Sequence, residues 1–239
     1  MQINITSAPD YAMAEVSLTA DEKVVVEAGS MVAMSPHMQI ETKARGGVLS
    51  SAKRMLGGES FFINTYTSAG NPGLIYIAPG PPGDLRHLQL PGGDFYIQSG
   101  SYVASSSGVQ LDTKWGGAKT FFGGEGLFIL KASGQGDLIF GSFGAIHEVD
   151  VDGNYSVDTG HIVAFDAGLT FNIRKVGGLK SLFLSGEGLI CDFSGKGKLY
   201  IQTRKPGSFV HWLTPFRPVK QESAGGPLGI IYNIIRRFI

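Results

Sequence analysis

The sequence predicts a mainly β protein: a β-sandwich or barrel-like body of three internal β repeats with pseudo-threefold character, short helical turns between the strands, and a C-terminal amphipathic helix. Three observations support this prediction. Apolar and polar residues alternate with the period of two that half-buried strands require. The 35 glycines are about twice the usual share and are scattered between apolar runs, as in a chain with many tight turns. A short marker also recurs around Gly29, Gly100 and Gly160.

The recurring marker consists of a strand, a glycine, two residues and the dipeptide Val-Ala. It reads VVVEAGSMVAM, FYIQSGSYVAS and YSVDTGHIVAF at its three positions. In each copy the strand pattern is interrupted at the glycine, the residue that most readily takes unusual backbone angles. The third copy has His161 where the others have Ser30 and Ser101, so we interpret His161 as a tolerated variant of a turn position.

Further elements follow each marker in a fixed order. An alternating strand comes first, at 38–43, 109–114 and 169–175. A glycine pair and a short segment with room for one or two helical turns come next. A Gly/Ser-Gly-Glu motif then opens another strand. A glycine turn, TSAGNPG, ASGQG or FSGKG, joins that strand to the following one in a predicted β-hairpin.

The repeats occupy residues 20–80, 91–145 and 151–205 of a single β-rich domain, 1–220, while residues 221–239 form a linker and the terminal helix. The first repeat is the longest because it includes the loop APGPPGDLRHL, whose prolines favour an extended and exposed path. Each repeat presents an apolar strand face that it cannot bury alone, so we expect the three to pack on one another.

Three glutamates, Glu59, Glu125 and Glu187, occupy the same position of the Gly/Ser-Gly-Glu motif. Equivalent positions give the carboxylates no reason to differ in pKa, as a catalytic acid and base must. The favoured interpretation is structural: each glutamate caps backbone donors or pairs with a lysine where a helical turn meets a strand. The alternative is a cation site at a repeat axis, where the three carboxylates would meet.

Composition and motifs give no support to a catalytic or nucleotide-binding role. Lys plus Arg equals Asp plus Glu at 20 each, so net charge attracts neither nucleic acid nor an anionic membrane. KWGGAKT lacks the glycine before Lys119 that a phosphate-binding loop needs, and no serine lies in a G-x-S-x-G elbow. The five histidines are dispersed. We therefore expect no catalytic residue, cofactor, metal or nucleic-acid partner.

The compartment is predicted from the cysteine count and from the start of the chain. The single cysteine, Cys191, lies among apolar residues, which predicts a buried thiol. MQINITSAPDYAMAEVSL has the features of neither a signal peptide nor a transit peptide. No stretch has the roughly eighteen apolar residues of a spanning helix. These features predict a cytoplasmic protein.

Two segments near the C-terminus carry candidate interaction surfaces. The first, KPGSFVHWLTPFRPVK at 205–220, combines Phe209, Trp212 and Phe216 with basic residues. Its interior prolines and lack of periodicity predict a strap that wraps the body and covers apolar surface. The alternative is a nucleic-acid platform on which bases stack.

The second segment, PLGIIYNIIRRFI at 227–239, has the pattern of an amphipathic helix. One face is apolar and the other includes two arginines: Ile231, Ile234, Ile235, Phe238 and Ile239 against Arg236 and Arg237. We expect the helix to dock on its own body or on a neighbouring subunit. Contact with a membrane surface or a partner protein is the alternative.

The stretches AGSMVAMSP, GGES or GGEG, and FGSFGAIHEVDV occur in this order over nearly the whole chain. In combination they resemble the family named for altered inheritance of mitochondria, which is widespread in bacteria and archaea as proteins of unknown function. The resemblance implies a β-sandwich-type fold grouped with the tryptophan RNA-binding attenuator protein, with no established activity or cofactor. Mitochondrial relatives are associated with the inner membrane and support respiratory-chain and cristae organisation. Without a transit peptide, a prokaryotic cytoplasmic protein is expected instead.

These observations predict a non-enzymatic scaffold or interaction protein that self-associates as a homo-oligomer. The C-terminal helix is its expected contact with a membrane surface or a partner protein. The alternative is a ligand- or RNA-binding module that uses grooves between the repeats, by analogy with the attenuator protein.

Overall fold

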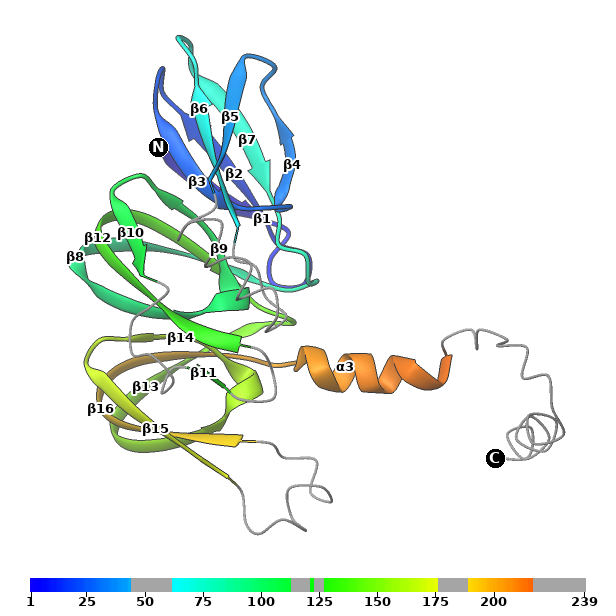
Figure 1. The fold of residues 1–239 in the computed structure, drawn as a ribbon, viewed down its shortest axis with the longest axis vertical. Coiled ribbons are helices and arrows are strands. Elements are labelled where there is room, and N and C mark those ends of the chain that lie inside the picture. The colour runs from blue at the N-terminus through cyan, green and yellow to red at the C-terminus, as the bar shows by residue number, and fades with distance from the viewer. Residues whose placement is uncertain (44–61, 113–120, 123–126, 176–188, 217–239) are drawn as a thin grey trace, which may run out of the picture. The chain divides into compact units, whose positions relative to one another are not determined.

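The computed structural model describes residues 1–43, 62–112, 121–122, 127–175 and 189–216. The chain separates into two compact units, Met1–Gly207 and Ser208–Ile239. Regular structure in the first unit is almost entirely β, which confirms the mainly β class predicted from the sequence (Figure 1). The described strands form one sheet of four and one sheet of twelve, and neither closes into a barrel.

The first group of strands spans residues 2–77 and contributes to both sheets. It contains β1 (Gln2–Thr6), β2 (Met13–Leu18), β3 (Lys23–Glu27), β4 (Met31–Met34), β5 (Met38–Lys43), β6 (Ile63–Ser68) and β7 (Gly73–Ile77). Strand β7 pairs with β2 and β4, whereas β6 pairs with β3 and β5. Strand β1 pairs with β2 along its other edge.

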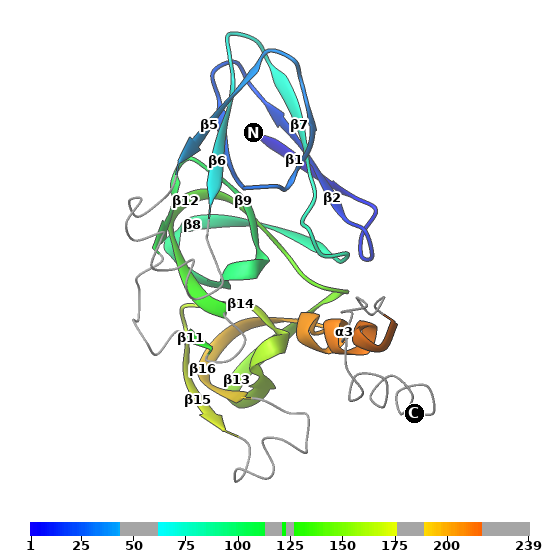
Figure 2. The same ribbon diagram turned by 45° about the vertical axis from the view of Figure 1, so that its right-hand side comes forward.

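The second group spans residues 85–141 and is built on two long strands. It contains β8 (Leu85–Gln98), the 3-10 turn η1 (Ser99–Ser101), β9 (Tyr102–Ser106), β10 (Val109–Asp112), β11 (Phe121–Phe122) and β12 (Leu127–Gly141). Strand β12 pairs with β8 along one edge and with β9, β10 and β11 along the other. The two long strands curve along their length (Figures 1 and 2).

The third group spans residues 146–202 and has the same construction. It contains β13 (Ile146–Asp158), the 3-10 turn η3 (Thr159–His161), β14 (Ile162–Asp166), β15 (Leu169–Lys175) and β16 (Leu189–Gln202). Strand β16 pairs with β13 along one edge and with β14 and β15 along the other. Helix α3 (Pro206–Leu213) and the 3-10 turn η4 (Thr214–Phe216) follow. None of the described helices has the length and apolarity needed to cross a membrane.

The Val-Ala dipeptide of the marker forms the same irregularity in all three groups. In β4, β9 and β14 the strand skips one residue against its partner, and the skipped residues are Val32, Val103 and Val163. An extra residue of this kind is a β-bulge, which bends the strand and increases its twist. In the second and third groups the marker glycine lies in the 3-10 turn directly before the bulge. The marker therefore encodes a turn followed by a bulge.

The predicted hairpins at ASGQG and FSGKG are wrong, because β12 and β16 each run through these residues as a single strand. Gly134 and Gly195 have φ of 105° and 123° here. A Cβ on either would lie 2.4 Å from the backbone oxygen of Gly108 or Gly168, so glycine lets the long strand bend against a neighbouring turn. In the first group the corresponding turn, 69–72, does separate two strands, but β6 and β7 enter different sheets.

The predicted extended loop APGPPGDLRHL is partly wrong as well. Residues 85–88 of that stretch already belong to β8, which continues through Pro91. The alternation of polar and apolar residues in LRHLQL is a strand pattern that the neighbouring prolines obscured. Proline is compatible with a strand position where its nitrogen is not needed for a backbone hydrogen bond.

The three groups are joined in series by β9 and β14. Strand β9 pairs with β3 of the first group, and β14 pairs with β8 of the second. Both junctions are apolar. Val103 and Ala104 are buried with Val24 and Val26 of the first group, while Val163 and Ala164 are buried in a cluster that contains Phe95 and Ile97 of the second. Val103 and Val163 thus each pack into the neighbouring group.

Candidate functional site

A pocket of about 480 Å³ lies within the first unit, where η1 and η3 approach the ends of β12 and β16. The marker glycines of both turns, Gly100 and Gly160, line it together with Gln98, Ser101 and Gln202. Its other lining residues are Pro79, Pro81, Gly141, Ser142, Phe143, Lys205, Pro206 and Gly207. The pocket therefore lies between the second and third groups, and its surface is mainly apolar.

Two polar side chains of the pocket wall are bonded to the protein itself. Gln202 accepts a hydrogen bond from the Phe143 amide (2.8 Å) and donates one to the Gly160 carbonyl (2.9 Å). The Ser142 hydroxyl donates to the Gly144 carbonyl (2.5 Å) and accepts from the Asp84 amide (3.3 Å). Such bonds satisfy buried polar groups and hold the turns in position, so they indicate a structural role.

The charged group in the pocket wall, Lys205, is paired as well. Its Nζ lies 2.9 Å from Asp158 Oδ2, and both side chains are mostly buried. The other oxygen of Asp158 accepts a hydrogen bond from the Gly160 amide (2.8 Å). This neutral pair gives the pocket no net attraction for a charged ligand.

Asp158 also belongs to a position that sequence reasoning missed. Glu27, Gln98 and Asp158 each lie two residues before the marker glycine, and each accepts a hydrogen bond from its own turn. The donors are the Ser30 hydroxyl (3.2 Å), the Ser101 hydroxyl (3.1 Å) and the Gly160 amide (2.8 Å). The sequence did contain a signal for this position: in all three markers, a side chain with a hydrogen-bond acceptor lies two residues before the glycine. His161, the predicted turn variant, bonds through Nδ1 to the Gln202 carbonyl (2.7 Å).

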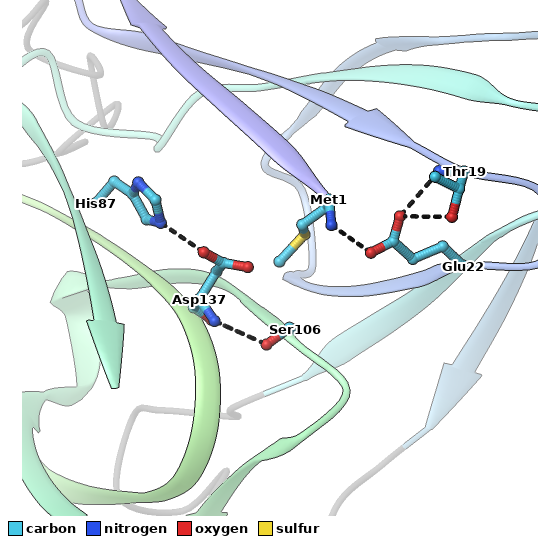
Figure 3. A network of polar contacts seen from close by, with 6 residues as sticks. All are labelled: Met1, Thr19, Glu22, His87, Ser106 and Asp137. Carbon is cyan, nitrogen blue, oxygen red and sulfur yellow. Dashed lines mark hydrogen bonds and ion pairs between the residues drawn. The ribbon is translucent and has the colours of Figure 1, made fainter. Parts of the chain in front are cut away.

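Among the described residues, His87 and Asp137 form the acid–base pair that comes nearest to a catalytic arrangement (Figure 3). His87 Nε2 lies 2.8 Å from Asp137 Oδ1 across β8 and β12. The nearby Ser106 hydroxyl accepts from the Asp137 amide (2.9 Å), so it bonds to the aspartate backbone and not to the imidazole. A serine nucleophile needs a hydrogen bond to its base, and this geometry lacks one.

Glu22 is the centre of a second polar network, at the start of the chain (Figure 3). Its carboxylate forms an ion pair with the Met1 amino group and accepts hydrogen bonds from the Thr19 amide (2.8 Å) and hydroxyl (3.1 Å). Burial acts to raise the pKa of Glu22, but these hydrogen bonds outweigh it and the pKa is lowered. The network ties β1 to the turn before β3.

The predicted buried thiol is confirmed. Cys191 is fully buried in β16, and burial together with the charge of Asp192 raises its pKa to about 12. A nucleophilic cysteine requires the opposite shift, toward the thiolate. Cys191 therefore acts as a small apolar core residue.

Exposed ion pairs lie across the strands of the third group. Arg174 Nε lies 2.5 Å from Asp192 Oδ2, and this bond, with a second from the Ser156 hydroxyl, lowers the pKa of Asp192. Hydrogen bonds to Glu148 and Asp150 raise the pKa of Lys198. Exposed pairs of this kind contribute little to stability, so they mark a solvated face.

The predicted cation site cannot be placed on this geometry, because Glu59, Glu125 and Glu187 all lie outside the described residues. The same is true of Ile231, Ile234, Ile235, Phe238, Arg236 and Arg237 of the predicted terminal helix. Within the described parts of the chain, no three His, Cys, Asp or Glu side chains are grouped as a metal site requires.

Comparison with known proteins identifies the family. The model of the family described as "Mitochondrial biogenesis AIM24" matches residues 3–204. The chain belongs to the AIM24 family. An uncharacterised protein of Streptococcus pyogenes serotype M6 is 30% identical over 228 residues, which cover 91% of this chain and 92% of the relative. A crystal structure of a Streptococcus pyogenes protein, 29% identical, covers 90% of this chain and 99% of its own with a TM-score of 0.77.

The AIM24 match ends at Arg204, two residues before α3 begins at Pro206. The segment 205–220 was predicted to be a strap without periodicity, and the structure corrects the lack of periodicity for residues 206–213, which form a helix. Phe209 and Trp212 lie three residues apart in α3, and Phe216 lies in the 3-10 turn η4 that follows. Neighbouring rings are in contact, with centroids 5.9 Å apart for Phe209 and Trp212 and 5.5 Å for Trp212 and Phe216. We call these three side chains the aromatic row.

Proposed function

We propose that this AIM24-family protein is a non-enzymatic interaction protein that binds a membrane surface peripherally through its second unit. The observation that carries the proposal is the exposure of the aromatic row: 42% for Phe209, 60% for Trp212 and 70% for Phe216. Adjacent exposed aromatic side chains are uncommon on proteins that remain free in solution and are typical of interaction surfaces.

A membrane surface fits the chemistry of this row better than nucleic acid does. Tryptophan is enriched where apolar chains meet headgroups, and a short helix with an apolar side can lie in that plane. The equal numbers of acidic and basic residues argue against a charge-driven partner. The predicted amphipathic pattern of 227–239 follows in the same unit. The resemblance to the family also implies that its mitochondrial relatives are membrane-associated.

Vesicle binding tests this function. Full-length protein should co-sediment with phosphatidylcholine–phosphatidylglycerol vesicles, and the double variant Trp212→Ser, Phe216→Ser should bind at least about tenfold more weakly, because both rings would lose their burial in the interface. Tyr11→Ser is the control, since Tyr11 is an aromatic residue that is 76% exposed but lies in the first unit. Equal binding by the double variant and the wild type would refute the proposal.

A second candidate function is binding of a small, mainly apolar ligand, which the pocket between the second and third groups favours. Gly207 lines the pocket and a Cβ there would meet open space, so Gly207→Phe should fill the pocket without a clash. Native mass spectrometry should then detect a co-purifying small molecule on the wild type and on Gly93→Phe, but not on Gly207→Phe. Gly93→Phe adds the same ring at an exposed glycine of β8 that does not line the pocket. Absence of bound mass on all three proteins would argue against this candidate.

Three finer expectations complete the proposal. The recurring bulges and strand pairings support descent of the three groups from one duplicated unit, and hence a scaffold of repeats. We keep the grouping with the attenuator-protein fold as a proposal that a superposition of each group on that protein would test. Cell fractionation would test the expected site of action, the cytoplasmic side of a membrane.

A further inference from the structure

The two ends of the series of groups have open strand edges. Among the described residues, β4 pairs only with β7, and β13 pairs only with β16. Inside the series the corresponding edges are occupied. Strand β4 holds the position in its group that β9 and β14 hold in theirs, because all three carry the marker bulge. Strand β13 likewise corresponds to β8, and to β3 in the first group.

The strands of the two internal junctions pair in the same register, and this register predicts which residues would face each other if an open edge paired with another strand. Ala104 lies opposite Val26 in the first junction, and Ala164 lies opposite Ile97 in the second. Val26 and Ile97 both directly precede the residue that caps the turn, and Val157 is the equivalent in β13. Ala33 of β4 is the equivalent of the two alanines. A third junction in this register would place Ala33 opposite Val157 and Ser35 opposite Tyr155.

Burial differs sharply between the filled and the open edges. Val103 and Val163 are 1% and 0% exposed, whereas the equivalent Val32 is 58% exposed. Phe95 is buried in the second junction, whereas Tyr155, at the equivalent position of β13, is 41% exposed. The open edges thus display apolar residues of the type that the internal junctions bury. Of the acidic residues of β13, Glu148, Asp150 and Asp152 precede this segment and Asp158 follows it, so residues 155–157 themselves carry no carboxylate.

We propose that β4 of one molecule pairs with residues 155–157 of β13 in a second copy of this chain, so that the protein assembles head to tail. The second copy is the occupant because it supplies the edge that the internal junctions already match in register and in side-chain type. This contact is heterologous: each molecule uses a different edge for each neighbour. It goes beyond the proposed membrane function and uses a different unit of the chain.

Two single substitutions test the pairing by sedimentation velocity of the full chain. Val32→Lys places a charge on the edge of β4, and Tyr155→Lys places one on the edge of β13. Each variant alone should be monomeric at concentrations where the wild type associates. Mixed together they should form dimers and nothing larger, because the intact β13 of one variant can still pair with the intact β4 of the other. Ile40→Lys, at an apolar position of β5 that is 47% exposed, should associate like the wild type.

Three outcomes would overturn the proposal: a wild type that stays monomeric, a Val32→Lys variant that associates as the wild type does, or a mixture that yields no dimer. Cysteines at the register pair complete the test. Ala33→Cys in one chain and Val157→Cys in another should form a disulfide-linked dimer on oxidation. A disulfide within one chain carrying both substitutions, formed in dilute solution, would show that the two edges close on each other, and this also contradicts the head-to-tail pairing.

Discussion

The filled junctions and the open edges contain the same sequence marker in different surroundings. Val103 and Val163 are buried against a neighbouring group, while Val32 sits in the same bulge with more than half of its side chain in solvent. The difference lies in the neighbouring strand and not in the local residues. A marker therefore determines local backbone shape, and the position of its group in the series determines whether its apolar residues form core or surface.

The largest expected difference in stability is between a charge placed in a filled junction and a charge placed on an open edge. Val163→Asp would bury an unpaired carboxylate in the second junction, and we expect it to lower the free energy of unfolding by about 4 kcal/mol or more. Val32→Asp should change the stability of the monomer by less than about 0.5 kcal/mol. Urea denaturation of both variants at low protein concentration measures the difference. Similar losses at the two positions would contradict the contrast in burial.

Replacing a glycine that bends a long strand of the third group should cost more stability than replacing a turn glycine of the first group. Gly195→Ala forces an unfavourable φ and a clash with the Gly168 carbonyl, so we expect a loss of about 3 kcal/mol. Gly70→Ala in the first group meets only open space at a φ of 71° and should lose about 1 kcal/mol. Thermal and urea unfolding would report both. An equal cost would mean that the close approach at Gly168 carries no strain.

A smaller effect is expected when the bulge valines are truncated. Val103→Ala should cost about 2 kcal/mol, since it removes buried methyl groups and leaves a cavity in the first junction. Val32→Ala should be nearly neutral in the monomer. Chemical denaturation with both variants at one concentration provides the comparison, and a neutral Val103→Ala would show that the junction repacks.

The smallest effect concerns pH. Cys191 lies opposite Val157 of the open edge yet is fully buried, and its pKa is raised to about 12. An unfolded thiol ionises near pH 8.5 while the native thiol stays protonated, so native stability falls as pH rises above that value. Between about pH 8.5 and 9.5 the wild type should lose about 1 kcal/mol more than Cys191→Ala. Parallel pH profiles for the two proteins would contradict a raised thiol pKa.

The sequence allowed the class of fold and the turn at each marker to be predicted, because strand periodicity and glycine placement are local properties. It failed where a distant backbone decided the outcome. Gly134 and Gly195 suggest hairpin turns, but they bend continuous strands past Gly108 and Gly168, which local patterns do not show. The candidate site was harder still. The pocket arises where η1 and η3 come together. Their glycines, Gly100 and Gly160, are sixty residues apart in the sequence.

Side-chain exposure was the other property that sequence could not supply. The aromatic row was noticed from its composition, but the ring contacts between Phe209, Trp212 and Phe216 depend on the fold of α3 and η4. The sequence did not single out the open edges, because Val32 occupies the same marker position as Val103 and Val163. Whether such a valine is buried depends on a strand of another group, which the local sequence does not show.

Amide hydrogen exchange as a function of protein concentration tests most directly whether the open edges are unoccupied junctions. In dilute protein, the amides of β9 and β14 that face a neighbouring group should be strongly protected, while those on the outer edges of β4 and of residues 155–157 exchange rapidly. At high concentration the outer-edge amides should become protected, with the rest of the molecule unchanged. Outer-edge amides that are as protected in dilute monomer as those of β9, or that stay unprotected in the associated state, would contradict this account.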